Sequence, residues 1–185
     1  MRITLDLVQQ PGMIYLLVEG LRTPGPEAYE NGVRAVTRRM QRNNPKAKLT
    51  NFIETASTVR RELPAGIEEA IMIGEDGRVL EGLSSNFFAV RQGTIWTAEQ
   101  GVLSGITRSF VLEVIREEGI PLWLEGLPQE ELSGLDEAFI TSASRAVLPV
   151  VEIDGRPVAN GKPGLITRKL LQGYLNRLVQ DLEKV

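Results

Sequence analysis

The chain has 185 residues, of which 42% are hydrophobic and 24% are charged, and its formal net charge at pH 7 is −3. These values are typical of a soluble globular protein with one domain, or with one domain and part of another. The sequence contains neither cysteine nor histidine, which excludes disulfides, thiolate metal sites, histidine-based triads and most zinc sites. Any acid–base chemistry must therefore use Lys, Asp, Glu or Tyr, or a bound cofactor.

The beginning of the chain predicts an antiparallel pair of strands. Residues 2–8 alternate between apolar and polar side chains, and residues 13–19 form a second strand-like run. A Pro-Gly turn separates the two runs. Residues 23–32, which contain two prolines and two glycines, are predicted to be a linker. A further strand is expected over residues 32–39.

The middle of the chain predicts one helix and two hairpins. Residues 49–61 carry apolar side chains at helical spacing, with Thr50 or Asn51 as the expected N-cap. An Asp-Gly pair within residues 69–80 and a Gln-Gly pair within residues 86–97 interrupt apolar runs, which is typical of hairpin turns.

The last part of the chain predicts two helices and three strands. The helices are expected over residues 107–118 and 164–182, and a helical turn over residues 128–132. The strands are expected over residues 122–124, 137–141 and 147–153. Hairpins mixed with single helices, without a repeat, predict an α+β fold.

No apolar run approaches the ~20 residues of a membrane span, and the first residues do not resemble a secretory signal. We therefore expect a cytoplasmic protein without a membrane segment. Nucleic-acid binding is a weak alternative, because the spacing of the only basic cluster is typical of the solvated face of a strand. That cluster comprises Arg34, Arg38, Arg39 and Arg42.

Lys48 is the first candidate for chemistry and is one of only five lysines. It lies between a proline-containing turn and the start of an apolar helix. Partial burial at such a junction would lower the pKa of the amine and leave the neutral nucleophile that Schiff-base chemistry needs. From its position alone, a solvated lysine in front of a helix is the more ordinary interpretation.

Three further segments carry polar groups between the predicted elements. Glu81 opens a polar loop that ends at Asn86, where a carboxylate could pair with a cationic ring, although Ser and Asn also favour plain turns. Thr107 lies two residues after Gly105 at a predicted helix start, where the free backbone N–H groups could bind a phosphate. Residues 141–145 offer hydroxyls, backbone donors and one arginine.

Read together and in order, these segments resemble the class IV aminotransferases, the group of branched-chain and D-amino-acid aminotransferases, and the related aminodeoxychorismate lyases. The Lys-x-x-Asn motif of the family is matched by Lys48 and Asn51. Its other motifs are matched, in family order, by residues 81–88, 93–97, 103–108 and 136–150.

The resemblance implies a pyridoxal 5′-phosphate enzyme. Lys48 would hold the cofactor and move a proton at the substrate α-carbon, and Glu81 would keep the pyridine nitrogen protonated. Ile106 and Thr107 would bind the phosphate. The implied cofactor-binding set is completed by Ser85, Asn86, Ser142 and Ala143, and no metal site is implied.

The resemblance also implies how the chain is organised. Residues 33–185 would be the large C-terminal domain of a fold-type IV enzyme, a mixed sheet or pseudo-barrel with flanking helices. Residues 1–22 would be the remaining strands of a smaller N-terminal domain, joined by the linker 23–32. The activity implied is transfer of an amino group between an amino acid and a 2-oxo acid, with branched-chain substrates favoured, in a homodimer.

Several departures from the family pattern leave two alternatives open. Ala143 replaces a threonine that helps hold the phosphate, Phe52 replaces a tyrosine near the ring oxygen, and Leu83 replaces a small residue. Most of the smaller domain, with its phosphate-binding arginine, is not recognisable. A lyase-like pyridoxal-phosphate enzyme and a truncated, non-catalytic domain are therefore the alternatives to an aminotransferase.

Overall fold

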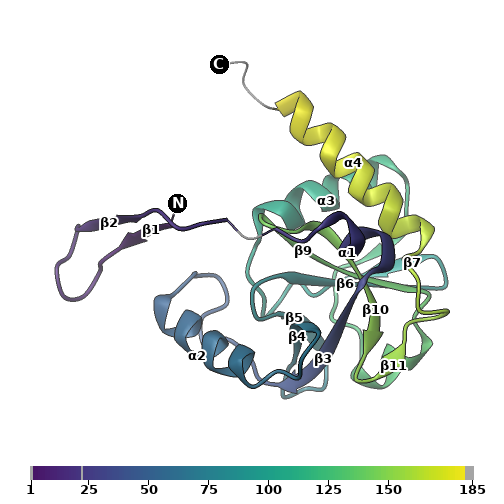
Figure 1. Ribbon diagram of the computed structural model, residues 1–185, viewed down its shortest axis with the longest axis horizontal. Coiled ribbons are helices and arrows are strands. Elements are labelled where there is room, and N and C mark those ends of the chain that lie inside the picture. The colour runs from purple at the N-terminus through teal and green to yellow at the C-terminus, as the bar shows by residue number, and fades with distance from the viewer. Residues whose placement is uncertain (1, 22, 182–185) are drawn as a thin grey trace.

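The computed structural model describes residues 2–21 and 23–181, which form an α+β fold around one large sheet (Figure 1). Two short strands come first and a long helix comes last. The elements are β1 (Arg2–Leu5), β2 (Ile14–Leu17), α1 (Pro26–Asn31), β3 (Val33–Arg39), α2 (Thr50–Arg61), β4 (Ile67–Ile73), β5 (Val79–Gly82), β6 (Asn86–Arg91), β7 (Thr94–Trp96), α3 (Ile106–Glu117), β8 (Leu122–Trp123), the 3₁₀ helix η1 (Gln129–Gly134), β9 (Glu137–Ser142), β10 (Ala146–Ile153), β11 (Arg156–Pro157) and α4 (Leu165–Asp181).

Six strands of the large sheet close into a barrel. They follow one another in the order β3, β4, β5, β6, β9, β10, and β10 pairs in turn with β3. The pairings of β3 with β4 and with β10 are parallel, whereas the other pairings in the ring are antiparallel. This mixed, closed sheet confirms the predicted α+β class and the pseudo-barrel that the resemblance implies.

Alternation along the strands explains why the ring forms. On β6, Phe87 and Ala89 pack into one apolar cluster, while Phe88 and Val90 pack into another. The first cluster includes buried side chains from all six strands of the ring, so it fills the interior of the barrel. Such period-two patterning fixes the register, because a slip of one residue would turn each side chain to the opposite face.

Helices cover the outside of the barrel on two sides (Figure 1). Helices α3 and α4 pack against the outward face of β6 and β9, where Phe88 and Phe139 stack with ring centroids 4.7 Å apart. Helix α2 covers a different side, where Ala56 contacts a smaller apolar cluster that includes Ala70 and Leu83. The predicted helices and strands of this region are confirmed to within a few residues at their ends.

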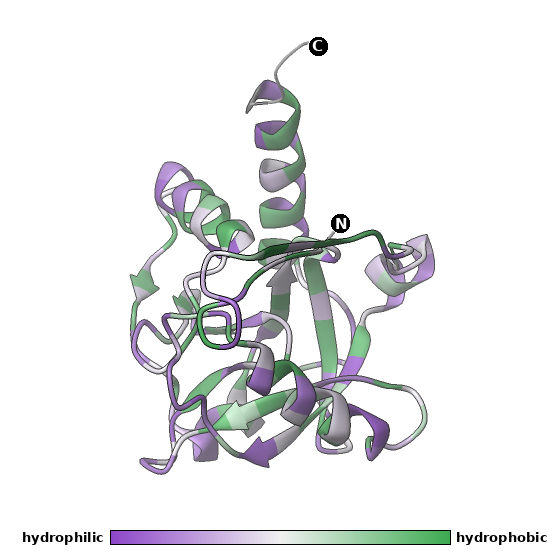
Figure 2. Cartoon of the chain, turned by 90° about the vertical axis from the view of Figure 1, so that its left-hand side faces the viewer, coloured by the Kyte–Doolittle hydropathy of each residue, from purple (hydrophilic) through white to green (hydrophobic). Residues whose placement is uncertain are grey.

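The first two strands stand apart from the barrel. β1 and β2 pair antiparallel with each other, as predicted, and their large apolar side chains are exposed. In Figure 2 this hairpin is coloured hydrophobic over much of its length. A two-stranded hairpin of this kind is marginally stable by itself in water.

The predicted linker contains a helix that the sequence pattern did not reveal. Residues 26–31 form α1, in which Pro26 occupies the first turn, a favourable position for proline. Tyr29 packs on the barrel core and donates a hydrogen bond to the carbonyl oxygen of Arg145 at 3.1 Å. Six residues are too few to display a helical period, which explains why the sequence pattern did not predict α1.

Glu137, which lies within the matched family segment 136–150, connects the barrel to the last helix. Its carboxylate accepts hydrogen bonds from the backbone N–H groups of Ile166 and Thr167 at 2.9 and 2.7 Å, and from the Thr167 hydroxyl at 2.7 Å. A strand residue thus satisfies the free donors at the start of α4.

We predict that Glu137→Ala lowers the free energy of unfolding by about 2 kcal/mol, because the first turn of α4 loses a charged acceptor. Urea denaturation would measure the change. Glu75→Ala, in the exposed β4–β5 turn, is the matched control and should stay within about 0.5 kcal/mol of the unchanged chain. Equal stability of the two variants would contradict the capping role.

Candidate active site

One pocket of about 470 Å³ collects all the residues predicted to bind the cofactor. Its wall is formed by residues from four parts of the chain, between positions 42 and 60, 81 and 86, 103 and 107, and 141 and 143. The predicted residues that line it are Lys48, Glu81, Ser85, Asn86, Ile106, Thr107, Ser142 and Ala143. Their individual roles stay predictions.

Glu81 is the buried carboxylate of the pocket, with only 1% of its surface exposed. Its Oε2 accepts hydrogen bonds from Asn86 Nδ2 at 3.0 Å and from the Leu103 backbone N–H at 3.1 Å. Burial raises the pKa of Glu81 to about 7, although Arg42 and the Leu103 N–H oppose that change. The group can therefore gain or lose a proton near neutral pH.

Arg42 corrects the expectation of a solvated basic strand face. Arg38 and Arg39 are exposed, but the Arg42 side chain is only 7% exposed. Its Nε donates to Glu81 Oε1 at 2.7 Å, and its guanidinium lies 3.8 Å from the centroid of the Phe52 ring. The chain leaves β3 at Arg39 and turns back, so the strand alternation does not extend to Arg42.

Lys48 lies on the pocket wall but remains exposed. The partial burial considered from the sequence is therefore not observed in this chain. Lys46, the second lysine on the pocket wall, is exposed as well. Leu49 occupies the N-cap position of α2 without a side-chain cap, so neither Thr50 nor Asn51 has the expected capping role.

The start of α3 forms the third wall of the pocket. The helix begins at Ile106 with Gly105 as its N-cap, so Thr107 lies inside the helix instead of capping it. Ile106 is 76% exposed and Thr107 is buried. A Cβ added to Gly105 would collide with Oδ1 of Asn86, so the missing side chain at Gly105 leaves room for the Asn86 amide against the helix start.

The end of β9 forms the fourth wall. The buried Thr141 hydroxyl has no hydrogen-bond partner among the residues that the structure describes, and Thr141 lines the pocket. A buried polar group without a partner is unfavourable unless a ligand or a water molecule supplies one. Ser142 is half-buried and Ala143 is exposed beside it.

Sequence reasoning missed a second buried carboxylate behind the pocket wall. Glu69, at the start of β4, contacts Arg60, Arg145 and the serines of the β5–β6 turn. Glu69 belongs to a Glu-Glu pair in front of an apolar run, where a solvated strand end is the ordinary interpretation. A buried arginine partner 76 residues away leaves no local pattern.

The described residues contain neither a membrane-spanning helix nor a metal-binding cluster. No helix between residues 2 and 181, residue 22 aside, is long and apolar enough to cross a membrane. In the same part of the chain, no three Asp or Glu residues are grouped in a way that could hold a metal ion.

We predict that Glu81 makes stability depend on pH between about 4.5 and 7. The fold raises its pKa, so Glu81 contributes stability below its ordinary pKa, and that contribution is lost as the pH rises through 7. Relative to Glu81→Gln, the unchanged chain should lose on the order of 2–3 kcal/mol across this window.

Urea denaturation at half-unit pH steps would measure this difference. The amide in Glu81→Gln does not titrate, so the pH-dependent part of the difference between the two chains isolates the titration of Glu81. Glu75→Gln is the exposed control. Parallel stability curves for the unchanged chain and Glu81→Gln would refute the raised pKa.

Known proteins share both the sequence and the fold. The family described as amino-transferase class IV matches residues 5–153. A branched-chain-amino-acid aminotransferase of Pseudomonas aeruginosa is 31% identical over 159 residues, which cover 82% of this chain and 52% of that protein. A D-alanine aminotransferase of Bacillus licheniformis is 34% identical over 158 residues, which cover 84% of this chain and 56% of that protein.

The fold is also similar to that of a solved branched-chain aminotransferase. The T.th. branched-chain amino acid aminotransferase with pyridoxamine 5′-phosphate superposes with a TM-score of 0.77 at 32% identity, over 84% of this chain and 54% of that chain. The chain thus spans about half the length of the curated relatives that it matches. Barrel, helices and ordered motifs agree with the family match, and the chain belongs to the class IV aminotransferase family.

Proposed function

We propose that this chain is the cofactor-binding part of a pyridoxal-phosphate-dependent aminotransferase that acts on an amino acid and a 2-oxo acid. The observation that carries the proposal is the meeting of Lys48, buried Glu81 and the start of α3 in one pocket. An amine, a carboxylate and a set of backbone donors match the aldehyde, the ring nitrogen and the phosphate of that cofactor.

The residues present fit the cofactor. The unpartnered Thr141 hydroxyl offers a hydrogen bond to a polar ligand. Gly105 has no side chain to fill the space beside Asn86. The start of α3 lines the pocket with Gly105, Ile106 and Thr107. Glu81 is buried and its pKa is raised to about 7, so a cationic ring beside it would favour the ionised carboxylate. Each observation concerns a different part of the pocket, and Lys48 on the same wall adds the amine for the aldehyde of the cofactor.

Each residue would have a separate task. When bound, the cofactor supplies an electron sink that stabilises negative charge on the substrate α-carbon. Lys48 would hold the cofactor covalently and then move the proton at that carbon. Glu81 would keep a proton on the ring nitrogen, and Asn86 would orient the Glu81 carboxylate. The N–H groups of Ile106 and Thr107 would hold the phosphate, with Ser85, Ser142 and Ala143 completing the seat.

Branched-chain substrates are favoured within this proposal. The pocket wall includes the apolar side chains of Phe52, Ile53, Ala56 and Leu103, which suit an aliphatic substrate side chain. The relatives include both branched-chain and D-alanine aminotransferases. A substrate assay should therefore compare the L and D forms of each amino acid. We also propose a homodimer located in the cytoplasm.

The domain organisation is part of the same proposal. Residues 33–185 would form the cofactor-binding domain, residues 1–22 would be the last strands of a smaller domain, and residues 23–32 would join them. The exposed apolar side chains of β1 and β2 support this division, since they suit a hairpin covered by further protein.

We predict that the chain, mixed with pyridoxal phosphate, gains the visible absorbance band of a lysine-bound cofactor. Lys48→Ala should abolish the band, because the proposal assigns the covalent bond to the Lys48 amine. Lys46→Ala is the matched control, because Lys46 lines the same pocket, and should keep the band. Borohydride reduction followed by peptide mass analysis should find the added mass on Lys48. A well-folded chain without the band, or with the mass on Lys46, would refute the proposal.

We predict further that the start of α3 recognises the phosphate. The unchanged chain should bind pyridoxal phosphate more tightly than pyridoxal, which lacks the phosphate. Thr107→Val, which keeps the shape of the buried side chain but removes its hydroxyl, should reduce that preference about 10-fold. Titration by absorbance would measure both ligands. An unchanged preference would exclude the Thr107 hydroxyl as a phosphate ligand.

A further inference from the structure

We infer that Glu69 is a positioning residue, which through Arg60 and the β5–β6 turn holds helix α2, and with it Lys48, opposite Glu81. The part of the inference that concerns the cofactor rests on the proposed function. The part that concerns α2 stands on the geometry of the chain alone.

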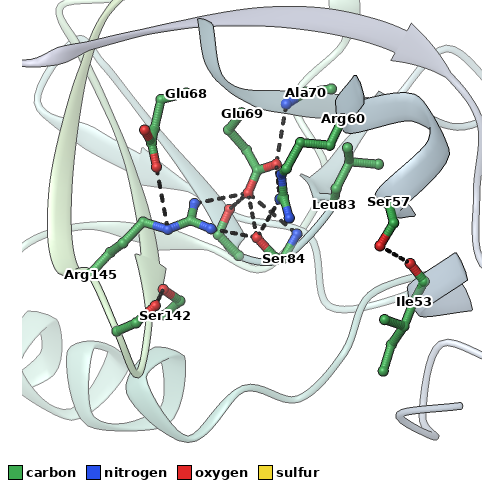
Figure 3. Close-up of polar contacts among 12 residues, drawn as sticks. Ile53, Ser57, Arg60, Glu68, Glu69, Ala70, Leu83, Ser84, Ser142 and Arg145 are labelled. Carbon is green, nitrogen blue, oxygen red and sulfur yellow. Dashed lines mark hydrogen bonds and ion pairs between the residues drawn. The ribbon is translucent and has the colours of Figure 1, made fainter. Parts of the chain in front are cut away.

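Glu69 is fully buried and accepts six hydrogen bonds (Figure 3). Its Oε1 accepts from Arg60 Nη2 and from the Ala70 backbone N–H, both at 3.2 Å. Its Oε2 accepts from Arg145 Nη1 at 2.9 Å, from the Ser84 and Ser85 hydroxyls at 3.0 Å, and from the Ser84 backbone N–H at 3.3 Å. Each carboxylate oxygen of Glu69 thus accepts at least two hydrogen bonds.

The partners of Glu69 come from three different segments around the pocket. Arg60 belongs to α2, Ser84 and Ser85 form the β5–β6 turn, and Arg145 belongs to the β9–β10 turn. Each of these segments contributes to the pocket wall. Figure 3 shows Arg60 and Arg145 converging from opposite sides on Glu69 and Ser84. One carboxylate therefore ties together three walls of the pocket.

The β5–β6 turn packs closely against the Glu69 side chain. A Cβ added to Gly82 would lie 2.7 Å from Cγ of Glu69 and would also collide with the Ser85 hydroxyl. Burial would raise the pKa of Glu69, but the charge and hydrogen bond of Arg145, together with Arg60 and Ser84, outweigh it and lower the pKa. Glu69 thus remains a fixed negative charge at neutral pH, unlike Glu81.

Helix α2 depends on this connection more than the other long helices do. It has one buried residue, Ala56, whereas α3 has six. Within the described part of the chain, Arg60 makes the only side-chain hydrogen bonds that leave α2, to Glu69 and to Ser84 at 2.8 Å. The hydrogen bonds of Thr55, Ser57 and Arg61 stay inside the helix.

The position of α2 determines where Lys48 lies. Lys48 precedes the first helical residue, Thr50, by two positions. Lys48 is exposed, so surrounding side chains do not enclose its amine. A helix that moved away from the β5–β6 turn would carry Lys48 away from Glu81.

Amide hydrogen exchange on the cofactor-free chain tests whether Glu69 holds α2. Glu69→Gln and Arg60→Gln should each speed exchange in residues 50–61 by roughly 3- to 10-fold, while the strands of the barrel exchange as before. Arg61→Gln, whose side chain is exposed and bonds only within the helix, should exchange like the unchanged chain. Unchanged exchange in α2, or an equal rise throughout the chain, would overturn the inference.

Two variants keep the exchange test decisive. Glu69→Gln leaves two arginines without their buried charge partner and could unfold the chain. Arg60 is 43% exposed and lies outside the barrel, so Arg60→Gln decides the question if Glu69→Gln does not fold. Arg60→Lys, which keeps the charge, should restore part of the protection.

Titration with pyridoxal phosphate tests the link to Lys48. Arg60→Gln should weaken binding roughly 3- to 10-fold and shift the pH at which the visible band of the bound cofactor titrates, while Arg60→Lys restores part of both and Arg61→Gln changes neither. Unchanged affinity and pH profile in Arg60→Gln would overturn the positioning of Lys48. If the unchanged chain gives no band, the proposed function fails, and the exchange measurement still decides whether Glu69 holds α2.

Discussion

Closure of the six-stranded barrel is the constraint on which the pocket depends. β9 pairs with β6 on one side and with β10 on the other, and β10 completes the ring by pairing with β3. The register of β9 against β6 sets Thr141 opposite Asn86, so the end of β9 meets the β5–β6 turn. Segments that lie about 55 residues apart in the sequence thereby share one pocket wall. Loops positioned by a rigid sheet in this way can hold polar groups at fixed distances.

The barrel also buries two carboxylates, Glu69 and Glu81, beside the β5–β6 turn. Their surroundings shift the two pKa values in opposite directions. Glu69 is surrounded by donors and two arginines, which keep its pKa below the ordinary value. At Glu81 the effect of burial exceeds the opposing effects of Arg42, Arg108 and the Leu103 N–H, so its pKa rises to about 7. A carboxylate fixed in the charged form suits a structural anchor, whereas one that titrates near neutral pH suits a partner for a cationic ring. The pKa difference therefore matches the two proposed roles: Glu69 positions the walls of the pocket, and Glu81 contacts the cofactor.

The sequence was sufficient for most elements and for the outline of the pocket, because these depend on local patterns. Apolar runs that a turn interrupts, such as residues 86–97, reveal a hairpin, and ordered motifs select Lys48 and Glu81. The errors arise where long-range contacts decide. Arg42 looked solvated because its partner, Glu81, lies 39 residues away. Glu69 went unnoticed, and Arg145 was noted only among the polar groups of residues 141–145, since only closure of the barrel brings the β9–β10 turn to β4. The contact of Glu137 with the start of α4, 30 residues further along the chain, was likewise not predicted from the sequence.

The exposure of Lys48 changes what the chemistry requires. Burial of the amine was the first explanation for a reactive lysine, but the structure leaves Lys48 open to solvent. Its reactivity towards an aldehyde must then come from placement, because holding two groups at the reacting distance can replace several kcal/mol of activation free energy. Placement requires α2 to keep a fixed distance from Glu81, and α2 has little buried surface with which to hold itself. The Arg60–Glu69 contact therefore matters to the proposed chemistry, even though neither side chain would touch the reacting atoms.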